Sequence, residues 1–241
     1  MPKTSAICLT ILACLISVPT IAANIVTLNT TPWAIAKEQE TGGVIADFAR
    51  EISQRTGIAF SPRGLPASRL VQMINEGEAD VALLNAVTPM EAETLGPVFV
   101  IPVVAVARPG VTLKQYEDLK SLRLGVVTGL NLGTPIDTDT SLNKSAEPNY
   151  DQIIRKMEAG RLDVTYGVAV SVRASAGSIG LAHVLGDAIP LQTVTIALRA
   201  GLKSTSADQR AALGKALTAM RDDGTIDQLR NKYFNADWSL K

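Results

Sequence analysis

Polar side chains follow two apolar runs of the sequence at matching positions, where they could bind a small solute through hydrogen bonds. Asn85 and Thr88 follow the apolar run at residues 81–84. Tyr166 lies within a second such run, at residues 164–170, and Ser171 comes just after that run. Short apolar runs of this kind are typical of buried parallel strands, and ligands bind beyond the carboxyl ends of such strands. We therefore predict that Asn85, Thr88 and Tyr166 contact a ligand, with packing as the alternative role for Asn85 and Tyr166.

Four further residues are candidates for the same site. Trp33 follows a proline at the end of the first apolar run, and its ring could form a wall of the site or pack in the core. Thr128 and Gly129 follow another apolar run, and their backbone N–H groups could hold an anion or could form an ordinary strand-to-helix turn. Arg69 lies near the start of a predicted helix, where a cation gains nothing from the helix dipole. Arg69 could anchor an anionic ligand, or it could be solvated or pack within its lobe.

The sequence predicts no catalytic residue, no metal site and no cofactor. The chain has one histidine, His183, and its two cysteines, Cys8 and Cys14, precede residue 24, so a transition-metal site would have too few ligands. An enzyme would need a carboxylic acid with a raised pKa in the site, and Glu91 is the candidate that we can name. A surface glutamate is the simpler interpretation of Glu91, so we predict a binding protein rather than an enzyme.

The composition and the N-terminus indicate an exported protein whose partner is a small molecule. Lys+Arg and Asp+Glu are both 23, so the chain lacks the basic surface that nucleic-acid binding requires. Residues 1–23 combine an early positive charge, an apolar run at residues 7–18 and small residues at the end, the pattern of a cleaved signal peptide. We predict cleavage after Ala22 or Ala23, with a retained anchor or a lipoprotein cleavage at Cys14 as alternatives.

Two stretches of the chain repeat one pattern, which predicts two lobes built on the same plan. Gly77 matches Gly160 and Asp80 matches Asp163 at one constant offset, and each pair lies between an amphipathic run and an apolar run. A glycine just past the last helical turn is favoured because this position needs a positive φ. Each copy therefore predicts the end of a helix, a turn and then a buried strand.

Alternating helical and strand-like segments predict an α/β fold with a mostly parallel sheet in each lobe. Two long apolar segments, at residues 97–107 and 192–199, are expected to be strands that cross between the lobes. The other expected strands are residues 24–29, 58–60, 81–84, 122–127 and 164–170. The expected helices are residues 44–55, 66–76, 149–160, 206–221 and 225–234. The expected loops are residues 61–66, 134–147 and 171–180.

The order of these motifs resembles the periplasmic solute-binding proteins of family 3, which include the amino-acid-binding components of ATP-driven importers. Pro32-Trp33 matches the proline–aromatic pair after the first strand of that family, and residues 43–52 are similar to its first helix entry. Residues 65–80 resemble the Trp/Pro-x-x-Arg…Gly-x-x-Asp segment of divergent members of the family. Residues 118–129 resemble the segment that opens the second lobe, and residues 222–226 resemble the break between the last two helices. The resemblance covers essentially all of the chain after the predicted signal peptide.

The resemblance implies the two-lobed periplasmic-binding-protein fold with two hinge crossings. The expected first lobe is residues 24–106, the expected second lobe is residues 107–196, and residues 197–241 are expected to return to the first lobe. Family members hold the ligand carboxylate with an arginine after a first-lobe strand and the amino group with an aspartate after a second-lobe strand. Here Glu91 stands near the first position and residues 166–171 contain no acid, so the resemblance leaves the ligand open.

The resemblance also implies a function. The protein is expected in the periplasm as a monomer that captures an amino acid or related small polar solute by hinge closure, for an inner-membrane ABC permease. One alternative is a periplasmic sensor that passes its closed form to a membrane receptor. Another is a dehydratase-like enzyme on the same fold.

Overall fold

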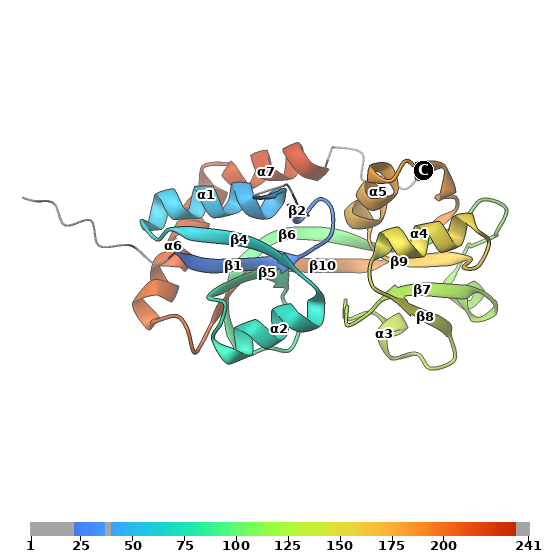
Figure 1. Cartoon of the computed structure of the whole chain (residues 1–241), viewed down its shortest axis with the longest axis horizontal. Coiled ribbons are helices and arrows are strands. Elements are labelled where there is room, and N and C mark those ends of the chain that lie inside the picture. The colour runs from blue at the N-terminus through green and yellow to red at the C-terminus, as the bar shows by residue number, and fades with distance from the viewer. Residues whose placement is uncertain (1–21, 37–39, 235–241) are drawn as a thin grey trace, which may run out of the picture.

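The structure is a computed structural model that describes residues 22–36 and 40–234, which form two lobes joined by two long strands (Figure 1). Lobe 1 contains β1 (Ala23–Leu28), β2 (Ile35–Ala36), β3 (Thr41–Gly42), α1 (Val44–Thr56), β4 (Phe60–Leu65), α2 (Ala67–Glu76), β5 (Val81–Asn85), α6 (Ala207–Asp222) and α7 (Thr225–Phe234). Lobe 2 contains η1 (Tyr116–Ser121), β7 (Arg123–Val127), α3 (Pro135–Thr138), β8 (Asn143–Glu147), α4 (Tyr150–Glu158), β9 (Val164–Val168), α5 (Ala169–Ser178) and η2 (Ala182–Val184). The joining strands are β6 (Ala92–Ala107) and β10 (Ala188–Gly201).

Among the described residues, no helix is both long enough and apolar enough to span a membrane. The predicted signal peptide lies almost wholly outside the described residues.

A single eight-stranded sheet runs through both lobes in the order β4-β1-β5-β10-β6-β9-β7-β8. The three outer strands on each side are parallel, while β6 and β10 form an antiparallel ribbon between them. β5 joins this ribbon at Ile196–Ala200, and β9 joins it at Val103–Ala107. The stretch between these two junctions connects the lobes. The predicted fold class and the two crossings are confirmed, whereas the predicted lobe limits stay predictions.

The repeated glycine–aspartate turn forms the same hydrogen bonds in both lobes. Gly77 ends α2 and Gly160 follows α4, both in the left-handed conformation with φ of 80° and 66°. In lobe 1 the Asp80 amide donates to the Asn24 carbonyl (3.0 Å) and the Asp80 carboxylate accepts from the Asn24 amide (2.7 Å). In lobe 2 Asp163 makes the same pair of bonds with Arg123 (2.9 and 3.0 Å). Each aspartate therefore fixes the start of the neighbouring parallel strand, which explains the repeat.

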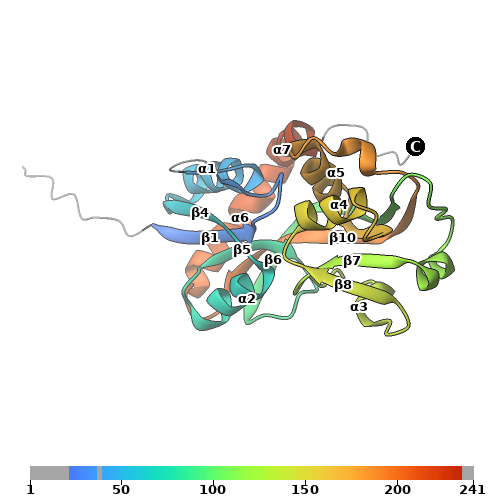
Figure 2. The same cartoon turned by 45° about the vertical axis from the view of Figure 1, so that its right-hand side comes forward.

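Helices cover both faces of the sheet in each lobe (Figures 1 and 2). In lobe 1, alternate strand residues point to opposite sides, so that Ile25 packs under α1 while Val26 packs on α2. In lobe 2, α4 and α5 share a core with the lobe-2 end of β6. Trp33, Phe99 and Phe234 pack together, with ring centroids 4.9–6.1 Å apart, and join the first loop to β6 and α7.

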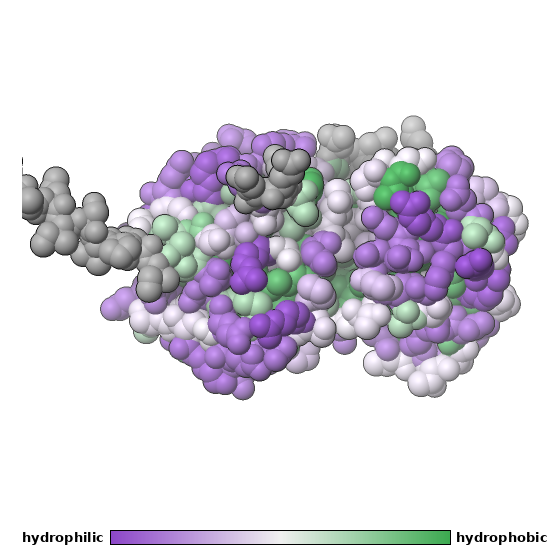
Figure 3. All heavy atoms as spheres, viewed as in Figure 1, coloured by the Kyte–Doolittle hydropathy of each residue, from purple (hydrophilic) through white to green (hydrophobic). Residues whose placement is uncertain are grey.

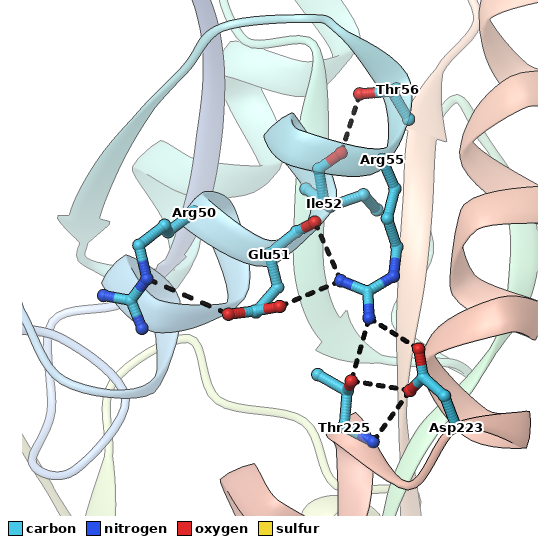
Figure 4. A network of polar contacts seen from close by, with 7 residues as sticks. All are labelled: Arg50, Glu51, Ile52, Arg55, Thr56, Asp223 and Thr225. Carbon is cyan, nitrogen blue, oxygen red and sulfur yellow. Dashed lines mark hydrogen bonds and ion pairs between the residues drawn. The ribbon is translucent and has the colours of Figure 1, made fainter.

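A polar network attaches the C-terminal helices to α1 (Figure 4). The Arg55 guanidinium donates to Glu51 on its own helix (2.9 Å) and to Asp223 (2.7 Å) and Thr225 (2.9 Å) between α6 and α7. Asp223 in turn accepts from the Thr225 amide at 3.0 Å. These bonds, with the apolar contacts of α6 and α7, place the last two helices on lobe 1.

Three segments expected to be loops are ordered elements instead. Residues 61–65 belong to β4 and residues 143–147 form β8, the two edge strands of the sheet. An edge strand tolerates proline and polar side chains, as in Ser61–Arg63 and Asn143–Ser145, so neither strand shows an apolar pattern. Residues 171–178 lie in α5, which packs Val172 and Ala176 into the lobe-2 core although its composition is small and weakly periodic.

Candidate functional site

A cavity of about 40 Å³ lies between the two lobes, beyond the carboxyl ends of β1, β5 and β7. On the surface a notch separates the lobes at the lower side of the molecule (Figure 3). Lobe 1 and β10 line the cavity with Thr27, Leu28, Thr30, Trp33, Ala67, Val71, Leu83, Leu84, Asn85, Thr88 and Ile196. Lobe 2 lines it with Gly129, Leu130, Asn131, Leu132, Tyr150, Val168 and Ser171.

Trp33 closes one side of the cavity and contacts both lobes. The loop after β1 places its indole against Phe99 and Phe234, so that only 3% of the residue is exposed. The indole N–H donates to the Ser171 hydroxyl oxygen at 2.8 Å, and Ser171 lies in the first turn of α5. This buried hydrogen bond joins lobe 1 to lobe 2.

Asn85 makes a second connection across the cavity. The amide nitrogen of this side chain donates to the Asn131 carbonyl of lobe 2 at 3.3 Å, and the residue is 3% exposed. Nearby, Gly129 approaches the start of α2 so closely that a Cβ on it would lie 3.6 Å from the Ser68 amide nitrogen. The two lobes are thus in contact on both sides of the cavity, which is a closed arrangement.

Two hydroxyl groups in the cavity wall have no hydrogen-bond partner among the described residues. They are the Tyr150 hydroxyl of α4 and the Thr30 hydroxyl, and both oxygen atoms are buried. The Val168 amide faces the Tyr150 oxygen, but the hydroxyl hydrogen has no acceptor. Burial raises the pKa of Tyr150, so this residue keeps its proton at neutral pH.

Gly167 makes room for the Tyr150 hydroxyl. A Cβ at position 167 would lie 2.0 Å from that oxygen, far closer than van der Waals contact allows. A glycine inside a strand often marks such a close approach. The strand β9 therefore lets a tyrosine from the neighbouring helix lie directly against its backbone at the edge of the cavity.

No described residue lining the cavity has a formal charge. One buried cation, Arg199 of β10, is 5% exposed and donates to the carbonyl of Thr88, which is a residue of the cavity wall. Burial lowers the pKa of Arg199, and its Nε has no partner among the described residues. The site thus offers neutral hydroxyl and amide groups next to apolar side chains.

The structure brings together four of the seven predicted site residues. Trp33, Asn85, Thr88 and Gly129 line the cavity, and Ser171 lines it from the other lobe. All of them follow a strand at its carboxyl end, which is why strand position predicted their location. Whether they bind a ligand stays a prediction.

The other three predicted residues do not line this cavity. Arg69 pairs with Glu78 at 2.6 Å on the surface of lobe 1. Thr128 uses both its amide and its hydroxyl on the Glu147 carbonyl, so its N–H is not free for an anion. The Tyr166 hydroxyl donates to Asp137 of α3, and burial together with that carboxylate raises the pKa of Tyr166.

Glu91, the candidate acid for the enzyme alternative, also lies elsewhere. Its carboxylate pairs with Lys203 at 3.1 Å, and more than half of the side chain is exposed. It therefore does not line the cavity, and no described side chain there is an acid.

Sequence reasoning missed Tyr150, Thr30 and Asn131 as residues of the cavity wall. Asn149 caps α4, because its side chain accepts from the Gln152 amide at 3.0 Å. The next residue, Tyr150, thus starts α4 at the edge of the cleft. The one available signal was Gly167 within a predicted strand, which indicated that some side chain approaches its backbone.

Comparisons with known proteins identify the family and the fold of this chain. The family model of the bacterial extracellular solute-binding proteins, family 3, matches residues 24–236. The "Probable amino-acid-binding protein YxeM" of Bacillus subtilis (strain 168) is 24% identical over 222 residues, which is 87% of this chain and 82% of that protein.

Solved structures share the fold at low sequence identity. An ancestral arginine-binding protein bound to arginine aligns with a TM-score of 0.74 and 18% identity, covering 88% of this chain and 98% of the other. A histidine kinase sensor domain with similarity to periplasmic binding proteins aligns with a TM-score of 0.76 and 14% identity. The alignment covers 88% of this chain and 96% of the sensor domain. Because the family model spans nearly the whole described chain, this protein belongs to the bacterial extracellular solute-binding proteins, family 3.

Proposed function

We propose that this protein is a periplasmic receptor that encloses a small solute between its lobes and delivers it to an inner-membrane ABC permease. The proposal rests on one observation above all. The cavity lies where the two lobes meet, and Trp33 with Ser171 and Asn85 with Asn131 form hydrogen bonds across it. A ligand at that place contacts both lobes at once, so its binding energy favours the closed arrangement.

The two-strand connection supports closure by a hinge. Between the junctions with β5 and β9, residues 193–195 of β10 pair with residues 100–102 of β6 and with no third strand, and register shifts flank this stretch between Pro190 and Gln192 and between Ile196 and Ala197. A short two-stranded ribbon with a register shift at each end bends more easily than the sheet of either lobe. Small backbone changes there rotate one lobe against the other.

The proposed location is the periplasm, after removal of the leader. Ala23 is the first residue of β1, and its amide donates to the Ala59 carbonyl at 2.8 Å. Of the two predicted cleavage positions, the one after Ala22 keeps this bond, whereas cleavage after Ala23 removes it. Mass spectrometry of the exported protein distinguishes the two, and we expect a mature chain that begins at Ala23.

A second candidate function is a ligand sensor, because a histidine kinase sensor domain shares the fold over most of both chains. The import function and the sensor function predict different effects of deleting the gene. Deleting the gene of an import receptor abolishes uptake of the labelled solute, while deleting a sensor changes gene expression and leaves uptake intact. We expect loss of uptake.

Ligand binding itself is tested by thermal unfolding of the chain from Ala23 onward, in the presence of amino acids, polyamines, small carboxylates, sugars and small amides. A solute that binds the native state alone raises the melting temperature by mass action. We expect at least one solute to do so, and Asn85→Ala to remove the shift. If no solute from any class raises the melting temperature, the proposed function is wrong.

A further inference from the structure

We propose that the solute held in this cavity is small and uncharged, rather than an amino-acid zwitterion. This inference rests on the proposed function and narrows it to a class of ligand. It follows from the charge, the unused hydrogen-bond donors and the size of the cavity.

Charge is the first argument. A carboxylate or an ammonium group that enters an enclosed site loses its hydration, and this cost is offset only by a paired charge or several hydrogen bonds. The described cavity wall has no charged side chain. Asp137 and Lys144 line an adjoining depression that shares Gly129, Leu130 and Asn131 with the cavity, but their charged groups already bind the Tyr166 hydroxyl and the Ile136 carbonyl.

Arg199 does not change this conclusion. Its guanidinium donates to the Thr88 carbonyl, and Arg199 is not among the described residues that line the cavity.

The unused donors point to an oxygen acceptor on the ligand. The Tyr150 hydroxyl has a hydrogen without an acceptor, and the Thr30 hydroxyl has no partner among the described residues. Ser171 accepts from Trp33 and keeps its own hydrogen for another acceptor. Leaving such donors unpaired in a closed site is unfavourable, because they lose their hydrogen bonds to water and gain none. A carbonyl or hydroxyl oxygen of a ligand placed between lobes would accept from them.

The size of the cavity limits the ligand. A cavity needs roughly 10–15 Å³ to hold one water molecule, so a cavity of about 40 Å³ accommodates only a few heavy atoms without further opening. The remaining wall, including Leu84, Val168 and the Trp33 ring, is apolar and suits a short hydrocarbon part. A short-chain amide or alcohol combines both features.

The test compares ligands of one size and different charge by isothermal titration calorimetry. Propionamide and lactamide are neutral, lactate is an anion and alanine is a zwitterion. We expect the neutral compounds to bind and the two charged compounds to bind at least tenfold more weakly. Tyr150→Phe should weaken the neutral ligand about tenfold, because it removes the donor and keeps the ring. Tyr116→Phe is the matched control, since the Tyr116 hydroxyl donates to Asp139 at 2.9 Å, outside the cavity wall.

The outcomes separate the inference from the proposed function. Tight binding of alanine or lactate with no binding of the amides overturns the uncharged-ligand inference and leaves the receptor function standing. Equal loss in Tyr150→Phe and Tyr116→Phe also overturns it, because the effect would then not come from the cavity. If neither charged nor neutral compounds bind, including in the wider solute panel above, the receptor function itself is wrong.

Discussion

Replacing Ser171 with alanine removes the oxygen that accepts the buried N–H of Trp33, and this bond joins the two lobes. In an open molecule the indole N–H can bind water, so the substitution costs nothing there. In the closed molecule the N–H stays buried without a partner, because Trp33 is 3% exposed. The substitution therefore acts on the equilibrium between open and closed forms rather than on the folding of either lobe.

The magnitude follows from the cost of a buried donor left unpaired, which is about 1–3 kcal/mol. Since about 1.4 kcal/mol corresponds to tenfold in an equilibrium constant, the closed form should lose roughly 5- to 150-fold in population relative to the open form. If closure is needed for tight binding, ligand affinity falls by the same factor.

The assay is the fluorescence of Trp33, measured in a Trp238→Phe background because the chain has two tryptophans. We expect the emission of the Ser171→Ala variant to shift to longer wavelength as Trp33 becomes solvated, and calorimetry to show the weaker affinity. Ser178→Ala on the same helix is the control, because the Ser178 hydroxyl donates to the Ser175 carbonyl within the helix. Unchanged emission together with unchanged affinity in Ser171→Ala would refute the reasoning.

Two further predictions concern stability. Gly167→Ala should lower the free energy of unfolding by about 1–3 kcal/mol, measured by urea denaturation, because its Cβ would lie 2.0 Å from the Tyr150 hydroxyl. Asp163→Asn should make the protein less stable at neutral pH and less sensitive to acid. Hydrogen bonds from Arg123 outweigh burial and hold the pKa of Asp163 well below its usual range. A carboxyl with a lowered folded-state pKa stabilises the protein above its unfolded pKa of about 3.9, and this contribution is lost as the pH falls from about 5 towards 2.

Each of these two predictions has its own control. Gly177→Ala tests the same substitution at a helical glycine whose new Cβ would meet no atom within 4 Å, so it should be neutral or slightly stabilising. A Gly167→Ala variant as stable as Gly177→Ala would contradict the close contact with Tyr150. For Asp163, the difference in stability between the wild type and Asp163→Asn should shrink as the pH is lowered. A difference that stays constant down to about pH 2 would show that the carboxylate is not the titrating group.

The sequence was sufficient for the features that local rules govern. The Gly77–Asp80 and Gly160–Asp163 turns were predictable, because a glycine with positive φ at a helix end has a local cause and the aspartate recurs at one constant offset from it. The edge strands β4 and β8 were missed because an edge strand is not required to be apolar.

The candidate site was predictable in part for a similar reason. Position at a strand end located Trp33, Asn85, Thr88 and Gly129, since the carboxyl ends of parallel strands meet at one edge of a sheet. It did not locate Tyr150, which reaches the cavity from a helix over a glycine on another strand. Side-chain direction depends on such packing and cannot be derived from spacing.

The most direct test of the central claim is the distance between the lobes with and without a bound solute. The chain from Ala23 onward contains no cysteine, so Gln72→Cys on α2 and Thr140→Cys after α3 provide two specific spin-label sites, one on each lobe and both exposed. Double electron–electron resonance is recorded on the free protein and with a solute that raises the melting temperature. A solute held between the lobes should shorten and narrow the distance distribution, and Ser171→Ala should broaden it again. A distribution that stays the same at saturating solute would contradict closure of the lobes over the ligand.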